Sequence, residues 1–131
     1  MKRILIMGLP GAGKTTLAKQ LADRMQAKWF NADEVRAIYN DWDFSREGRI
    51  RQSQRMRELA DASSESYVIA DFVAPLAEMR AIFAADFTIW MDTIKQGRFD
   101  DTNHVFEPPS QWDLKIINYD YNVDDIIKSL L

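Results

Sequence analysis

The sequence predicts an α/β fold, a three-layer sandwich in which a parallel sheet of about five strands carries helices on both faces. Two observations predict it. Short and almost wholly apolar runs recur along the 131-residue chain, and such runs are typical of strands buried on both faces. Segments with helical spacing of apolar residues lie between them, and strands joined by helices indicate a parallel sheet. The length suits a single domain over residues 1–131.

The elements are expected in a regular alternation along the chain. The predicted strands are the apolar runs Arg3–Met7, Lys28–Asn31, Tyr67–Phe72, Phe87–Met91 and Leu114–Ile117. The predicted helices are Lys14–Gln26, Ser45–Ala62 with Ser45 as N-cap, a segment from Pro75 to about Ala85, and a last helix capped by Asn122. The polar stretch Gly97–Pro109 contains Pro108-Pro109 and is predicted to be a loop.

Composition excludes several classes of protein. Lys and Arg total 17 and Asp and Glu total 20, so a net charge of −3 provides no general electrostatic footprint for nucleic acid. The absence of cysteine excludes disulfides, thiolate catalysis and Cys-based zinc sites. No apolar run approaches the ~18 residues that span a bilayer. We therefore expect a cytoplasmic protein without membrane contact, and its oligomeric state stays open.

The segment Gly8–Thr15 (GLPGAGKT) matches the phosphate-loop pattern. Glycines let backbone N–H groups approach a phosphate, and the dipole of the helix that follows favours the same anion. Lys14 would contact the β- and γ-phosphates of ATP, and the Thr15 hydroxyl would bind Mg²⁺. A chance match is the alternative, but a buried strand precedes the motif and an amphipathic helix follows it. The predicted ATP-binding residues are Gly8, Gly11, Ala12, Gly13, Lys14, Thr15 and Thr16.

Several classes of nucleotide-binding protein share this loop. The chain lacks the Asn-Lys-x-Asp motif of most GTP-binding switch proteins and is short for a motor or recombinase core. The remaining class is a compact ATP- and magnesium-dependent enzyme that transfers a phosphoryl group to a small hydroxyl acceptor. Such an enzyme mainly positions its substrates and neutralises developing charge, which requires acids and arginines.

Two aspartates follow predicted strands at the edge where ligands of parallel sheets bind. Asp33 is expected to touch the acceptor hydroxyl or the magnesium shell, or to cap a helix, and one residue can do both. Asp71 resembles the magnesium-orienting acid of phosphate-loop proteins, with a capping or turn residue as the alternative. The loop residues Asn118–Tyr121, after the last strand, are expected to border the adenine.

Periodicity separates the arginines of Ser45–Ala62. Arg49 falls on the inner side of the predicted helix, whereas Arg51 and Arg55 fall opposite. A buried arginine needs an anion, which is either a substrate phosphate or sulfate or a structural carboxylate. Arg98 either reaches the transferring phosphoryl group from its loop or is a surface residue. His104 is the single histidine and is expected on the surface.

These residues resemble the adenylylsulfate kinase family of small phosphate-loop kinases. Gly8–Thr16 resembles the family's glycine-rich start, and Phe30–Arg36, Phe44–Arg49 and Val68–Pro75 are similar to its segments Asp-Gly-Asp-Asn-x-Arg, Phe-Ser-x-x-Asp-Arg and the strand ending in Phe-Ile-Ser-Pro. The resemblance implies transfer of the γ-phosphoryl group of ATP to the ribose 3′-hydroxyl of adenylyl sulfate. It also implies that Asp33 is the second acid of the family's segment and that the acceptor is bound by Arg36, Arg49, Phe72 and Pro75.

The sequence also departs from the family pattern. Asn31 stands at the first acid, Asp71 at a small polar position and Ala77 at an arginine, and the basic lid helix after the fourth strand is missing. We therefore expect a more open site with fewer cations. Adenylyl sulfate is the preferred acceptor. The alternatives are a nucleotide or nucleic-acid hydroxyl, including a hydroxymethylated base, and a nucleotide-binding protein without transferase activity.

Overall fold

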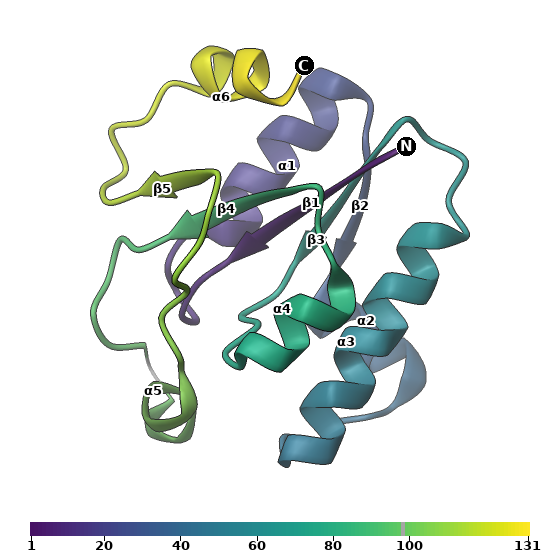
Figure 1. The fold of residues 1–131 in the computed structure, drawn as a ribbon, viewed down its shortest axis with the longest axis vertical. Coiled ribbons are helices and arrows are strands. Elements are labelled where there is room, and N and C mark those ends of the chain that lie inside the picture. Colours follow the sequence, from purple (N-terminus) through teal and green to yellow (C-terminus); the bar gives the residue numbers. More distant parts are fainter. Residues whose placement is uncertain (98) are drawn as a thin grey trace.

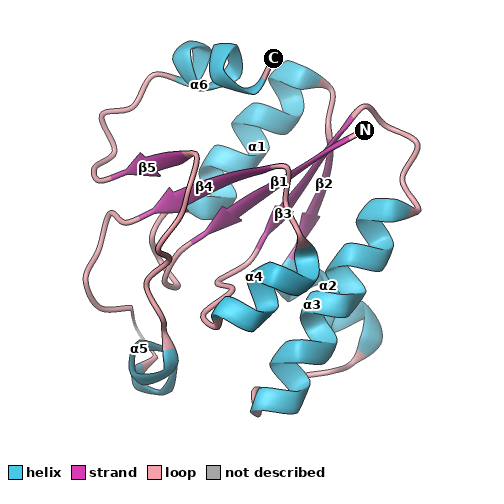
Figure 2. Ribbon diagram, in the orientation of Figure 1, coloured by secondary structure: helices cyan, strands magenta, loops and turns pink. Residues whose placement is uncertain are grey.

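The computed structural model describes residues 1–97 and 99–131. Its five strands form one parallel sheet in the order β2-β3-β1-β4-β5. Their bounds are β1 Lys2–Met7, β2 Lys28–Asn31, β3 Tyr67–Asp71, β4 Phe87–Met91 and β5 Leu114–Ile116. Helices α1 Lys14–Met25 and α6 Val123–Leu130 cover one face, and α2 Ala32–Tyr39, α3 Arg46–Asp61 and α4 Ala77–Phe83 cover the other (Figures 1 and 2). The predicted three-layer architecture is confirmed.

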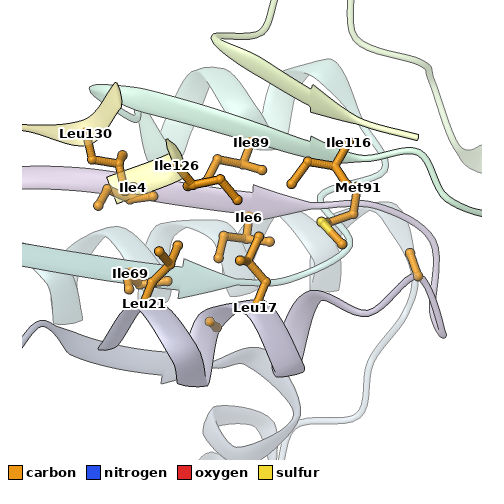
Figure 3. Packing of buried hydrophobic residues seen from close by; sticks show 12 residues of the cluster. Ile4, Ile6, Leu17, Leu21, Ile69, Ile89, Met91, Ile116, Ile126 and Leu130 are labelled. Carbon is orange, nitrogen blue, oxygen red and sulfur yellow. The ribbon is translucent and has the colours of Figure 1, made fainter. Parts of the chain in front are cut away.

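Alternate residues of β1 pack into opposite layers of the sandwich. Ile4 and Ile6 are fully buried in a cluster with α1 and α6 (Figure 3), whereas Leu5 and Met7 belong to a second cluster with α3 and α4. Both faces of the strand therefore meet apolar side chains. This explains why the sequence of β1 is continuously apolar rather than alternating.

Side-chain caps define where three of the helices begin. The Ser45 hydroxyl accepts a hydrogen bond from the Gly48 N–H at 3.2 Å, and Asn122 Oδ1 accepts one from the Asp125 N–H, so both predicted caps are confirmed. Helix α2 was not predicted. Its cap is Asn31, whose Oδ1 accepts from the Glu34 N–H, and the interpretation of Asp33 as a helix cap is therefore wrong.

The predicted loop over Gly97–Pro109 contains a short helix, α5 (Asp100–Val105), which lies apart from both helical layers in Figure 1. Tertiary hydrogen bonds hold its flanks. The Asn103 side chain bonds the backbone N–H and carbonyl of Gly97, and the Glu107 N–H donates to the Pro75 carbonyl at 2.7 Å. No side chain caps α5, so local sequence gave no signal for it. The expectation of a continuous loop is wrong. Helix α4 likewise begins at Ala77 rather than at Pro75.

Within the described part of the chain, none of the helices has the length and apolar character needed to cross a bilayer.

Truncation of the core on the α1 side should destabilise the fold. Leu21 is fully buried between α1 and the sheet (Figure 3), so Leu21→Ala should lower the free energy of unfolding by about 2 to 5 kcal/mol, because a cavity remains. Urea denaturation followed by circular dichroism measures this change. Ile38→Ala, at a side chain that is 79% exposed, is the control and should change the value by less than about 0.5 kcal/mol. Equal losses in both variants would contradict the assignment of this core.

Candidate functional site

The connection between β1 and α1 forms a loop that only glycine permits at several positions. Gly11 and Gly13 have φ values of 91° and 97°, in the left-handed region. A Cβ at Gly8 would lie 2.5 Å from the Met91 carbonyl oxygen, so β4 and the loop approach too closely for any side chain there. Helix α1 begins after Gly13 without a side-chain cap. Its first N–H groups are therefore available to an anion.

Lys14 folds back over this loop. Its Nζ donates to the Leu9 carbonyl at 3.0 Å, and the residue is only 8% exposed while it lines the adjoining cavity. Thr16, in the first turn of α1, lines the same cavity. The ammonium group thus lies in the concave side of the loop, where the phosphate-loop pattern places it.

The strand ends bring Thr15, Asn31 and Asp71 together. Asn31 and Asp71 are paired residues of β2 and β3. The Thr15 hydroxyl donates to Asp71 Oδ2 at 3.0 Å, and Asn31 Nδ2 donates to the same oxygen at 2.9 Å. Burial raises the pKa of Asp71, and the hydrogen bond from Asn31, the charge of Lys14 and the bond from Thr15 act against this rise. The Thr15 hydroxyl and the Asp71 carboxylate therefore lie next to each other beside the phosphate loop.

This donor set fits magnesium. Hydroxyl and carboxylate oxygens are ligands that Mg²⁺ accepts, and the Thr15 proton is directed to Asp71, which leaves oxygen lone pairs facing away from the carboxylate. Among residues 1–97 and 99–131, no group of three or more His, Asp or Glu side chains is placed to hold a metal ion. An ion here would take its remaining ligands from phosphate and water, as Mg²⁺ does in nucleotide sites.

Asp33 lies apart from this cluster. It is exposed on the first turn of α2 and lines the cavity, and its charge acts to raise the pKa of Arg36. The Thr15 hydroxyl accepts a hydrogen bond from Asn31 Nδ2 and donates one to Asp71 Oδ2, and neither bond involves Asp33. The structure thus separates the two predicted acids, with Asp71 beside the phosphate loop and Asp33 in the wall next to Arg36.

A cavity of about 790 Å³ extends from the phosphate loop to the connection between α2 and α3. Four aromatic residues from three separate segments line it: Trp42, Phe44, Phe72 and Phe99. Pro75 and Thr102 also line it. Because Phe99 and Thr102 belong to the segment that was expected to be an open loop, the site has a wall where we expected an opening.

Both predicted acceptor arginines line this cavity and are buried. The Arg36 guanidinium lies 4.3 Å from the centre of the Phe44 ring, and its Nη1 donates to the backbone carbonyls of Asp41 and Asp43. Burial lowers the pKa of Arg36. Arg49 donates from Nε to the Phe44 carbonyl at 2.8 Å. The prediction that Arg49 faces inward is confirmed, and both arginines also hold the loop that carries Trp42 and Phe44.

Two residues pack against the phosphate loop: Thr93, which the sequence did not single out, and Tyr119, which belongs to the predicted segment Asn118–Tyr121. The Thr93 hydroxyl donates to the Ala12 carbonyl at 2.7 Å. The Tyr119 ring is so close to Gly13 that a Cβ there would lie 2.9 Å from Tyr119 Cε1. Contact of Asn118–Tyr121 with an adenine stays a prediction. Arg98 lies outside the described residues, and His104 is exposed as expected.

Sequence comparison identifies the family. A sequence model described as Adenylylsulphate kinase matches residues 2–93. The chain belongs to this family. A probable adenylyl-sulfate kinase of Aeropyrum pernix is 34% identical over 88 residues, which are 59% of this chain and 46% of that protein. The chain thus spans about half the length of that curated relative.

Solved structures share the fold over nearly the whole chain. The APS kinase of Mycobacterium tuberculosis, in complex with AMPPNP and APS, is similar with a TM-score of 0.79 and 20% identity over 98% of this chain and 96% of that chain. A shikimate kinase of Acinetobacter baumannii, in complex with shikimate, is similar with a TM-score of 0.64 and 18% identity over 99% and 90%. At these identities the likeness establishes the fold, that of the small phosphate-loop kinases.

In this member of the adenylylsulphate kinase family, an ion-pair network holds the connection between α2 and α3. Arg51 Nε lies 2.8 Å from Asp41 Oδ2, Arg51 Nη2 lies 3.1 Å from Asp43 Oδ2, and Arg55 also pairs with Asp41. The arginines predicted to face away from the core therefore bind the carboxylates of this loop. The network fixes the loop from outside, whereas Arg36 and Arg49 fix it from the cavity side.

This network predicts a pH-dependent contribution to stability. Hydrogen bonds from Arg51 and from the Asp43 N–H hold the pKa of Asp41 well below its usual range. A depressed pKa contributes stability above the unfolded value near 3.8, and the contribution is lost as the pH falls toward the folded value. Asp41→Asn should therefore lower the Tm at pH 7, and its difference from the wild type should shrink at pH 3. Thermal unfolding across this range measures it, with Asp23→Asn on the exposed side of α1 as control. A difference that stays constant with pH would contradict the role assigned to Asp41.

Proposed function

We propose that the chain is an ATP- and magnesium-dependent kinase that transfers the γ-phosphoryl group to a hydroxyl of adenylyl sulfate. The observation that carries this proposal is the continuity of the cavity. One hollow joins the phosphate loop to an aromatic wall with two buried arginines. Membership of the adenylylsulphate kinase family supports the choice of acceptor.

The phosphate-loop half of the cavity suits the triphosphate of ATP. Backbone N–H groups of Gly11–Thr15 and the Lys14 ammonium would bind its phosphates. Thr15 and Asp71 would hold Mg²⁺, with Asp33 as a further predicted contact to its shell. When bound, the ion neutralises charge on the β- and γ-phosphates. The small size of the protein-supplied donor set agrees with an ion that arrives with the nucleotide.

The other half suits an acceptor with a flat base and anionic groups. Adenylyl sulfate combines an adenine with a phosphate and a sulfate. Aromatic side chains such as Phe44 and Phe72 offer surfaces for the base, and Arg36 and Arg49 offer charge for the anions. Pro75 adds an apolar contact. The aromatic and cationic groups are interleaved, since Arg36 itself stacks on Phe44.

In the proposed transfer, the acceptor hydroxyl attacks the γ-phosphorus. A new P–O bond forms as the bond to the oxygen bridging the β- and γ-phosphorus breaks, and ADP leaves with that electron pair. Asp33 orients the hydroxyl and accepts its proton. Lys14 stabilises charge on the transferring group. Arg98 remains our proposed additional cation for that group.

A screen of acceptors tests the proposal. Radiolabelled ATP is incubated with adenylyl sulfate, free nucleosides and nucleotides, and oligonucleotides that include hydroxymethylated bases. We expect label transfer to adenylyl sulfate that depends on Mg²⁺. Transfer to oligonucleotides alone would show that the acceptor is a nucleic-acid hydroxyl rather than adenylyl sulfate. Slow ATP hydrolysis whose rate no acceptor changes would indicate a nucleotide-binding protein without transferase activity. The arginines of α3 favour the small acceptor, because Arg51 and Arg55 pair with Asp41 rather than forming an open basic face.

Replacement of the loop lysine tests the nucleotide site itself. Lys14→Ala should weaken ATP binding by about 10- to 100-fold, the value of a charge-assisted contact, and should reduce turnover further. Calorimetric titration with a non-hydrolysable ATP analogue measures the affinity. Circular dichroism should remain unchanged, because the ammonium faces the cavity rather than the apolar core. Lys19→Ala, on the exposed side of α1, is the matched control. Unchanged affinity in Lys14→Ala would refute the assignment of this loop.

A further inference from the structure

Asn31 uses both ends of its side-chain amide. Its Oδ1 accepts a hydrogen bond from the Glu34 N–H at 3.1 Å and so caps α2. Its Nδ2 donates to Asp71 Oδ2 at 2.9 Å and to Thr15 Oγ1 at 3.3 Å. Because the oxygen is bound to the helix cap, the NH₂ group must face the carboxylate. The cap therefore determines the orientation of the amide.

The carboxylate that receives this amide is buried. Asp71 is 2% exposed, and the same oxygen accepts the Thr15 hydroxyl. The indole Nε1 of Trp29 on β2 is also buried and has no hydrogen-bond partner among the described residues. Donors from β2 and α1 thus converge on a single negative charge.

The strand register places Asn31 and Asp71 opposite each other on neighbouring strands. Asn31 and Asp71 occupy paired positions at the ends of β2 and β3, so each side chain reaches the other across the sheet edge. An aspartate at position 31 would still offer an oxygen to the Glu34 N–H, since aspartate is as good an N-cap as asparagine. Thr15 and Asn31 both donate to Asp71 Oδ2, so an asparagine at position 71 would place its NH₂ group at that point and donate to the new aspartate and to Thr15 Oγ1. The Thr15 hydroxyl would then donate to the aspartate at position 31, along the contact that Asn31 Nδ2 now makes with Thr15 Oγ1. The three contacts can therefore be kept in an exchange of the two residues, with donors and acceptors reversed.

We propose that Asn31 and Asp71 form one hydrogen-bonded pair at the magnesium site and that this pair carries a single negative charge. Asp71 carries the single negative charge beside Thr15, and Asn31 is the positioning residue that turns this carboxylate toward the hydroxyl. This inference rests on the proposed function, and it adds a residue that neither the phosphate-loop motif nor the acid pattern identifies. It requires that the charge be transferable between the two positions, whereas Asp33 contributes nothing to the pair.

Four proteins test the pair: the wild type, Asp71→Asn, the exchange Asn31→Asp/Asp71→Asn, and Asn31→Ser. Calorimetry measures the affinity for AMPPNP with and without Mg²⁺, and the ratio of the two affinities reports the magnesium effect without any turnover. The ratio should fall about 10- to 100-fold in Asp71→Asn and return to within about threefold of wild type in the exchanged protein. Asn31→Ser keeps an N-cap but removes the NH₂ donor, so its Tm should stay close to wild type while the ratio falls about three- to tenfold.

The outcomes separate this inference from the proposed function. No magnesium effect in the wild type would overturn both. A normal effect in the wild type, with an exchanged protein no better than Asp71→Asn, would overturn the pair and leave the kinase proposal standing. Circular dichroism and Tm show whether each variant folds. If the exchanged protein does not fold, Asn31→Ser decides, because an unchanged ratio in that variant refutes a positioning role for Asn31.

Discussion

The parallel register of β1, β3 and β2 is the constraint on which the site depends. It pairs Ile6 with Asp71 and Asp71 with Asn31, so three strand ends reach one edge of the sheet at the same level. The glycine-rich turn leaves β1 at this edge and places Thr15 against Asp71. A shift of one residue in the register would turn Asp71 toward the opposite layer. Such a shift would take the buried carboxylate away from Thr15 and Asn31, which donate to it, and leave a buried charge without its hydrogen bonds.

The aromatic half of the cavity depends on a different kind of restraint. The connection between α2 and α3 has no secondary structure of its own, and its carbonyl groups are bound by Arg36 and Arg49. The same guanidinium groups line the cavity. An anion that binds them therefore also acts on the loop that presents Trp42 and Phe44. If the acceptor binds as we propose, its binding and the order of this loop are coupled through two buried side chains, while Arg51 pairs with Asp41 and Asp43 of the same loop from outside.

Patterns of neighbouring residues in the sequence were sufficient to predict the features that depend on those residues alone. The apolar runs predicted the strands, the glycine spacing predicted the phosphate loop, and helical periodicity placed Arg49 inward and Arg51 outward. Asn31 was noted only as a departure from the family pattern, and its two hydrogen-bonding roles and helix α5 went unpredicted for a common reason. The two hydrogen-bonding roles of Asn31 depend on the register of β2 against β3, and α5 depends on bonds to Gly97 and Pro75 that lie outside its own sequence. The position of Asp33 in the cavity wall likewise follows from α2, which was not predicted.

The segment after β4 changes where charge neutralisation must originate. Residues 92–109 contain four acidic and two basic residues, and Lys95 pairs with Asp92 at 3.0 Å. Among the described residues of this segment, Phe99 and Thr102 line the cavity, and they add shape rather than positive charge. Under the proposed function, Lys14, the loop amides and an ion at Thr15 would neutralise a triphosphate from the phosphate-loop side, with Arg98 as our proposed further cation. This places an unusual demand on the single carboxylate at Asp71, and it gives a physical reason for the sequence to hold that carboxylate with an asparagine instead of a second acid.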